Sequence, residues 1–233
     1  MKYHKTIGIL GGMGPAATVN FFDKIVRATQ AGCDQDHPRI VVDCNPKIPD
    51  RTAAILQQGT DPLPTMLRSL RFLESAPVDM IAIPCVTAHY YHARLQAETA
   101  VPILHIVRET MVHLREHYPH IRRIGAISTT GTARTGLIAD ICAESGLTLF
   151  SSQEPMQTQR VMAAIYRIKA EGVSPEVKAW VREAADTLVQ QGAQAILAGC
   201  TEIPLVLADG ELAVPVLDPI AILAERILHQ AGA

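Results

Sequence analysis

The sequence predicts an α/β fold with two pseudo-symmetric half-domains, each a mainly parallel sheet flanked by helices, and a site in the cleft between them. Three observations lead to this prediction. Short apolar runs alternate with amphipathic stretches, the two halves of the chain align with each other, and a cysteine ends a corresponding apolar run in each half. Strands that are apolar at every position are typical of parallel sheets covered by helices on both faces.

Eight apolar runs are the candidate strands, and helical patterns lie between them. In one of these patterns, LPTMLRSLRFLES at residues 63–75, apolar side chains recur about every 3.6 residues and form one stripe. Alternating strands and helices predict βαβ units. The runs are TIGIL (6–10), RIVVDC (39–44), MIAIPC (80–85), VPILHI (101–106), RIGAIS (123–128), LTLFSS (147–152), AILAGC (195–200) and VPVLD (214–218).

An internal repeat relates the two halves. Residues 6–18 align with 123–135, residues 78–85 with 193–200, and residues 100–106 with 213–219. NPKIPDR, which ends in Arg51, also resembles EPMQTQR, which ends in Arg160. We therefore predict an N-terminal half at residues 1–105, with the helix at about 218–233 packed on it, and a C-terminal half at residues 106–217.

Composition narrows the classes of function. The chain has 233 residues, a formal net charge of -2 and a pI near 6.5, which gives no electrostatic footprint for nucleic acid. No apolar run approaches the roughly 18 residues that a membrane span needs. Five cysteines without a CxxC pair favour reduced thiols in the cytoplasm over a disulfide framework or a zinc site. A small-molecule partner is therefore predicted, with no membrane span and no metal site.

The repeat aligns Cys85 with Cys200, each at the carboxyl end of a predicted strand. Ligands of open α/β sheets bind at that edge. A following helix would present N–H groups that lower the pKa of a thiol from about 8.5 and favour the thiolate, which can act as a base. Two thiols on opposite sides of a ligand can remove a proton from one face of a carbon and return one to the other. That operation is stereoinversion.

Two other patterns receive less weight. GMGPAA at residues 12–17 follows a strand and fits GxGxxA, and Asp43 closes the next strand, as in a dinucleotide-binding fingerprint. However, Pro15 lies within the motif, and the aligned turn STTGT has only one glycine. HLREH at residues 113–117 has the spacing of a zinc-binding helix but lacks an obvious third ligand.

Five motifs in order carry a resemblance to a known family: GILGGMGP (8–15), IPDRT (48–52), PCVTAH (84–89), IYRIKAEG (165–172) and AGCTEIPL (198–205). The chain resembles the aspartate/glutamate racemases, which work without pyridoxal phosphate. The resemblance implies that Cys85 and Cys200 are the acid/base pair, one for each enantiomer, and that Arg51 and Lys169 grip the substrate carboxylate. It also implies a homodimer. Met13 and Thr130 would line the same cleft.

One position departs from the family, which usually reads PCNTAH, because Val86 replaces the asparagine. Backbone N–H groups of Val86 and Thr87 can still hold a carboxylate at the start of the following helix. Thr201, the hydroxyl neighbour of Cys200, completes the predicted substrate site. His89 and Glu202 can tune or relay a proton, or else serve as a core hydrogen bond and a helix cap.

The predicted function is cofactor-independent racemisation of an acidic amino acid, with aspartate ranked above glutamate. Two alternatives stay open. One is a related isomerase or decarboxylase that uses one cysteine on a small dicarboxylate, and the other is a ligand-binding module without turnover. A cysteine in each half favours racemisation over a one-cysteine mechanism.

Overall fold

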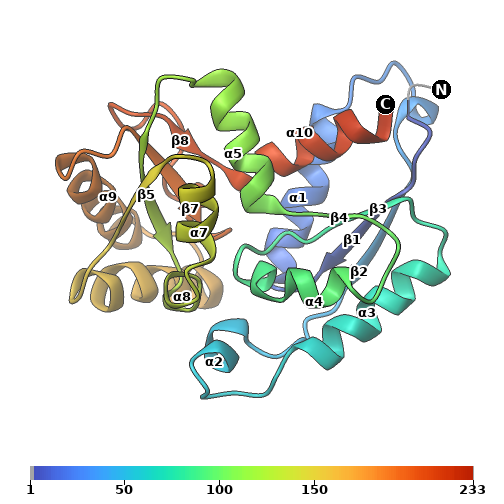
Figure 1. Cartoon of the computed structure of the whole chain (residues 1–233), viewed down its shortest axis with the longest axis horizontal. Helices are drawn as coiled ribbons and strands as arrows, with labels where there is room; N and C mark the ends of the chain where they lie inside the picture. The colour runs from blue at the N-terminus through green and yellow to red at the C-terminus, as the bar shows by residue number, and fades with distance from the viewer. Residues whose placement is uncertain (1–2, 233) are drawn as a thin grey trace. The chain divides into compact units, whose positions relative to one another are not determined.

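The computed structural model describes residues 3–232, and these residues form two compact units (Figure 1). The first unit runs to Glu109 and resumes at Ile220, and the second covers Thr110–Pro219. Each unit contains one four-stranded parallel sheet flanked by helices, which confirms the predicted fold class. Residues 1, 2 and 233, at the ends of the predicted halves, lie outside the described residues.

The sheet of the first unit has the strand order β2-β1-β3-β4. Helices α3 and α4 lie on one face of this sheet, and α1 and α10 lie on the other (Figure 1). The strands are β1 (Ile7–Gly11), β2 (Ile40–Cys44), β3 (Met80–Ala82) and β4 (Ile103–Leu104). The helical segments are α1 (Pro15–Ala28), η1 (Asp34–Asp36), α2 (Arg51–Ile55), α3 (Leu63–Ser75), η2 (Thr87–Tyr91), α4 (His92–Gln96) and α10 (Pro219–Gly232).

The sheet of the second unit has the corresponding order, β6-β5-β7-β8. Helices α7 and α9 lie on opposite sides of it (Figure 1). Its strands are β5 (Arg123–Ser128), β6 (Thr148–Ser151), β7 (Ala195–Gly199) and β8 (Val216–Leu217). Its helical segments are α6 (Thr130–Arg134), α7 (Leu137–Glu144), the π-helical η3 (Gln157–Met162), α8 (Ala163–Glu171), α9 (Pro175–Gln190) and η4 (Ile203–Leu205). The boundary between the units falls within α5 (Ile106–His117).

The C-terminal helix α10 belongs to the first unit, although most of that unit comes from the start of the chain. Arg226 on α10 pairs with Glu109 at 2.8 Å, and Lys5 donates to the carbonyl of Gln230 at 2.9 Å. Its apolar side chains Leu223 and Ile227 are fully buried. Burial of a leucine or isoleucine contributes about 1.5 to 3 kcal/mol, so packing holds this helix in place more than the ion pair does.

The core of the first unit includes the predicted stripe of α3. Met66, Leu70 and Leu73 are fully buried, and Leu67 is partly buried against the same cluster. Strands β3 and β4 are shorter than the apolar runs that predicted them. Pro84 has no N–H to donate to a neighbouring strand, so the pairing of β3 ends at Ala82 before the chain reaches the site.

The turn between β1 and α1 depends on a glycine. Gly12 has a φ of +89°, and a Cβ added there would lie 2.2 Å from the backbone carbon of Asn45. Only glycine accepts both the left-handed conformation and this close approach. The Gly12 N–H donates to the hydroxyl of Thr18 at 2.8 Å, which ties the turn to the first turns of α1.

No helix within residues 3–232 is both long enough and apolar enough to cross a membrane.

Candidate active site

In the first unit, Cys85 lies just beyond the end of β3. Its side chain is 7% exposed, and its backbone N–H donates to the carbonyl of Ile83 at 2.8 Å. The thiol is not in a disulfide. The next two residues, Val86 and Thr87, are also buried. A buried and reduced sulfur at the carboxyl edge of a parallel sheet is placed where open α/β sheets bind ligands.

His89 hydrogen-bonds to the backbone of Cys85 rather than to its sulfur. The Nδ1 atom lies 2.9 Å from the Cys85 carbonyl oxygen, and Nε2 lies 3.2 Å from the N–H of Ile106. A neutral ring with its proton on Nδ1 satisfies both, because Nδ1–H donates to the carbonyl and Nε2 accepts from Ile106. Burial lowers the pKa of His89 to about 4, which keeps the ring neutral near pH 7.

Arg51, at the start of α2, is held by backbone carbonyls. Its Nη1 donates to the carbonyls of Pro49 and Ile48, at 2.9 and 3.3 Å, and its Nη2 donates to the carbonyl of Met13 at 3.3 Å. Met13 itself is buried. The Nε atom of Arg51 is buried and has no hydrogen-bond partner, and no carboxylate within residues 3–232 pairs with this guanidinium. The cation is therefore positioned but its charge is not neutralised by an ion pair.

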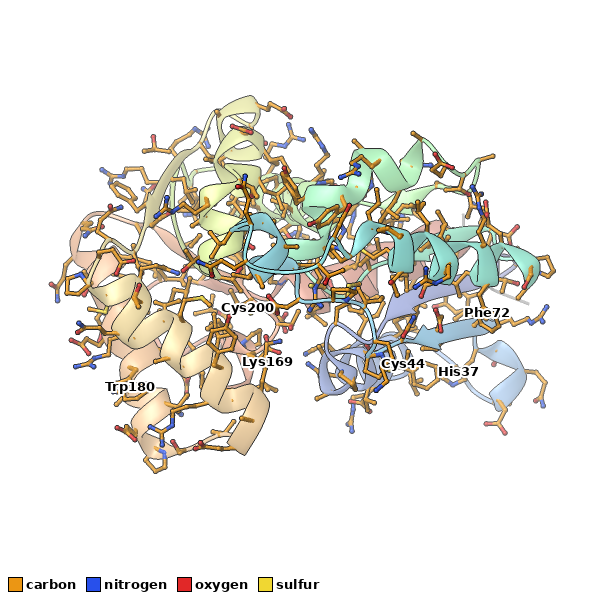
Figure 2. The ribbon with its side chains drawn as sticks, turned by 90° about the horizontal axis from the view of Figure 1, so that it is seen from below. His37, Cys44, Phe72, Lys169, Trp180 and Cys200 are labelled. Atoms are coloured by element: carbon orange, nitrogen blue, oxygen red, sulfur yellow. The ribbon has the colours of Figure 1, made fainter. Side chains whose placement is uncertain are left out.

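In the second unit, Cys200 follows β7 and is also 7% exposed and reduced. Its thiol donates to Oε2 of Glu202 at 2.9 Å, and Oε1 of Glu202 accepts from Nζ of Lys169 at 2.7 Å. Figure 2 shows Lys169, from α8, and Cys200 near each other. The hydroxyl of Thr201 also donates to Oε2 of Glu202, at 3.0 Å. The buried carboxylate thus connects all three side chains.

Thr130 starts the short helix α6 near the end of β5. Its N–H donates to the sulfur of Met162 at 3.2 Å, and its hydroxyl accepts from the side-chain amide of Gln157 at 3.3 Å. The same amide donates to the carbonyl of Ser128 at 3.0 Å. Gln157 is buried, so this amide fixes the turn that carries Thr130.

The predicted site residues thus fall into two sets. Met13 and Arg51 are joined by a hydrogen bond in the first unit, which also holds Cys85 to His89. Lys169 and Cys200 to Glu202 are joined in the second unit, and Thr130 lies in that unit without a recorded contact to them. Among the described residues, no three His, Cys, Asp or Glu side chains form a group that can hold a metal ion.

A family model described as Asp/Glu/Hydantoin racemase matches residues 10–227. The chain belongs to this racemase family. It is an isomerase of the amino-acid racemase type.

Relatives cover nearly the whole chain of this racemase. It is 29% identical over 229 residues to the "Broad specificity amino-acid racemase RacX" of Bacillus subtilis (strain 168), covering 94% of this chain and 95% of the relative. The Picrophilus torridus aspartate racemase structure is 28% identical, with a TM-score of 0.83 and coverage of 98% and 95%. A glutamate racemase from Francisella tularensis in complex with D-glutamate, 17% identical, has a TM-score of 0.70 over 99% of this chain and 81% of its own. At that identity it supports the fold alone.

The helix start predicted after each cysteine is found only for the first. Cys85 precedes η2, which continues directly into α4, whereas Cys200 precedes only the three-residue η4. A segment as short as η4 aligns few peptide dipoles, so it produces little of the field that lowers a thiol pKa. Burial and the Glu202 carboxylate raise the pKa of Cys200 well above its ordinary value, although Lys169 acts in the opposite direction. Burial and Glu202 therefore favour the protonated form of Cys200.

The sequence also failed to indicate two features of the racemase. Gln157, the first residue of η3, was not identified, because a glutamine in the sequence carries no signal of burial. Arg160, which the repeat aligned with Arg51, pairs instead with Glu183 at 3.0 Å on the surface, and its guanidinium lies 5.6 Å from the ring centre of Trp180. The repeat therefore extends to the sheets and the cysteines but not to this arginine.

Proposed function

We propose that this racemase interconverts the enantiomers of an acidic amino acid, with aspartate ranked above glutamate and without a cofactor, through Cys85 and Cys200. The thiolate of one cysteine removes the α-proton, and the thiol of the other donates a proton to the opposite face. The observation that supports this most is the pair of buried, reduced cysteines that follow β3 and β7, the equivalent strands of two sheets with the same order. The proposal requires both sulfurs to reach one substrate carbon.

Arg51 is the proposed grip for the substrate carboxylate. Loss of the α-proton places negative charge on the α-carboxylate, and a fixed donor that faces this charge stabilises the transition state by about 2.7 to 4 kcal/mol. The carbonyls of Ile48, Pro49 and Met13 fix the guanidinium without neutralising it, which supports this role. The contact predicted between Lys169 and the substrate stays a prediction, since its ammonium pairs with Glu202.

Two observations favour a second candidate, which is a racemase of wider substrate range. Val86 is buried and apolar where the family usually has asparagine, so no side-chain amide at this position can orient a polar substrate. The relative from Bacillus subtilis is named a broad specificity amino-acid racemase. Backbone N–H groups of Val86 and Thr87 are the proposed replacement for the amide.

The decisive experiment uses single enantiomers of aspartate, glutamate and alanine in deuterated water, without pyridoxal phosphate. Proton NMR follows loss of the α-hydrogen, and chiral chromatography follows inversion. We expect exchange together with inversion for aspartate. A rate for alanine as high as that for aspartate would instead support the wider range, and no exchange with any of the three would contradict a racemase of these substrates.

Replacement of each cysteine separates the two-cysteine mechanism from the one-cysteine alternatives. Cys85→Ser and Cys200→Ser should each abolish inversion while leaving, at most, exchange on one face. Cys142→Ser is the matched control, because Cys142 is a buried thiol of α7 with no predicted role. If either active-site variant still racemises aspartate fully, the two-cysteine assignment is wrong. If both variants bind aspartate and the native protein does not convert it, the alternative of a ligand-binding module without turnover is favoured.

The homodimer and the cytoplasmic location are also parts of this proposal. The first rests on the family resemblance, and light scattering during size-exclusion chromatography tests it. The second rests on the reduced cysteines, of which Cys33 and Cys44 are exposed. The domain division at residues 105 and 106, with residues 218–233 packed on the first half, is likewise kept as a proposal, and limited proteolysis tests it.

A further inference from the structure

The residues that follow the two cysteines differ at two positions of the repeat, and the second of these differences changes the charge. Aligning Cys85 with Cys200 places Val86 on Thr201 and Thr87 on Glu202. The second unit therefore has a carboxylate two residues after its cysteine, where the first unit has a neutral hydroxyl. In the proposed mechanism one cysteine removes a proton from the substrate and the other donates one. Each turnover must therefore start with one thiolate and one thiol. A difference in charge beside the two sulfurs can determine which of them carries the proton.

We propose that Glu202 is a positioning residue that keeps the proton on Cys200 in the resting enzyme, and that Lys169 holds Glu202 in place for this role. This inference rests on the proposed function. The thiol hydrogen of Cys200 points to Oε2 of Glu202 at 2.9 Å, and Oε1 is anchored by Lys169 at 2.7 Å.

Geometry and burial support this assignment. The side chain of Glu202 is 8% exposed, so its charge is little screened by water. Its Oε2 atom accepts from both Cys200 and Thr201, and an acceptor with this charge favours the protonated form of a nearby thiol. Two charged groups act on Cys200, which are Glu202, from the same loop, and Lys169, from α8.

The inference has a direct consequence for turnover. Cys200 starts as the acid, so Cys85 is the sulfur that must lose its proton first. At high pH, loss of the proton from Cys200 leaves two thiolates and no acid, and kcat/KM falls. Because the two enantiomers have equal free energies, kcat/KM falls at the same pH in both directions. The pH of this fall therefore reports on Cys200.

The experiment titrates each cysteine with ¹³C at Cβ by NMR, because the Cβ chemical shift changes when a thiol loses its proton. We expect the midpoint of Cys200 to lie above about 8.5, the ordinary pKa of a free thiol. In Glu202→Gln it should fall by about one pH unit or more, since a neighbouring charge is removed. In Lys169→Met it should rise, because an ammonium that favours the thiolate is lost.

Glu211→Gln is the matched control. Glu211 also accepts from a lysine, Lys178, at 2.7 Å, but that pair is on the surface. The Cys200 midpoint should not move in this variant. An unchanged midpoint in Glu202→Gln, or a native midpoint at or below about 8.5, would overturn the inference.

The pH profile of kcat/KM for aspartate gives the second readout. We expect the high-pH limb of this profile to move to lower pH in Glu202→Gln. If Glu202 had only a structural role, the substitution would lower kcat/KM at every pH without moving the limb. The two proposals can fail separately. If the protein does not racemise aspartate but the NMR midpoints are as expected, the proposed function is wrong and the assignment of the proton to Cys200 stands. If the protein racemises aspartate but the Cys200 midpoint does not respond to Glu202→Gln, the function stands and the proton assignment is wrong.

Discussion

Acidification should destabilise the first unit through His89. The neutral ring donates to the Cys85 carbonyl and accepts from the Ile106 N–H, and it packs against His105 with 4.8 Å between ring centres. Protonation would remove the acceptor and place a charge in a buried position. The ring of His92 lies 5.9 Å from that of His89, so a charge there would add repulsion.

The expected magnitude follows from the two pKa values. The pKa of His89 is lowered from 6.5 to about 4 in the folded protein, chiefly by burial. The unfolded chain therefore binds the proton more tightly, and stability falls as the pH falls from about 6.5 through about 4. At 1.36 kcal/mol per pKa unit, the loss between pH 7 and pH 4 is about 3 kcal/mol. The pKa of His105 is lowered further, to about 2, so its contribution acts in the same direction.

Urea unfolding followed by circular dichroism at a series of pH values measures this loss, and hydrogen exchange of the Ile106 amide reports on the first unit alone. His89→Gln should be less stable than the native protein at pH 7, since a buried N–H or carbonyl that loses its partner costs about 1 to 3 kcal/mol. Its stability should depend less on pH, so the two curves converge toward pH 4. His4→Gln, which removes an exposed imidazole of the same unit, is the control. Parallel curves for His89→Gln and the native protein would refute the reasoning.

Three further predictions follow, two on packing and one on a surface contact. Leu70→Ala should lower the free energy of unfolding by about 2 to 5 kcal/mol, measured by urea titration, because Leu70 is fully buried; a loss below 1 kcal/mol would contradict this. Gly12→Ala should reduce both soluble yield and thermal stability, since its Cβ would collide with the backbone of Asn45, and an unchanged melting temperature would count against the strained turn. Trp180 is the single tryptophan and lies 5.3 Å from the guanidinium of Arg167. Arg167→Ala should therefore change its fluorescence intensity, and an unchanged emission spectrum would show that the cation does not contact the ring in solution.

The sequence predicted most of the fold because a strand that is buried on both faces of its sheet appears in the sequence as a continuous apolar run. β1 and β7, and β5 after its exposed first residue Arg123, consist of apolar or small residues that the structure buries, and each strand matches a run identified from the sequence. The repeat likewise predicted two similar half-domains, and their sheets have corresponding strand orders.

The chemistry of the site was harder to predict. The chain after Cys200 reads as a possible helix start, and nothing in the letters indicates a three-residue 3₁₀ turn. The contact of Lys169 with Glu202 joins α8 to a loop after β7, so it depends on tertiary packing. Glu202 and His89 were named only as possible modifiers, because a buried partner is invisible until the surrounding elements are placed.

The return of α10 to the first unit affects how the protein is made. Leu223 and Ile227 pack in the same unit as the residues up to Glu109, yet they are synthesised only after the whole second unit. The contiguous segment Thr110–Pro219 has all its strands before that point. Until α10 has been synthesised, the apolar surface that it covers in the first unit stays exposed. During this interval the nascent first unit is a potential substrate for chaperones.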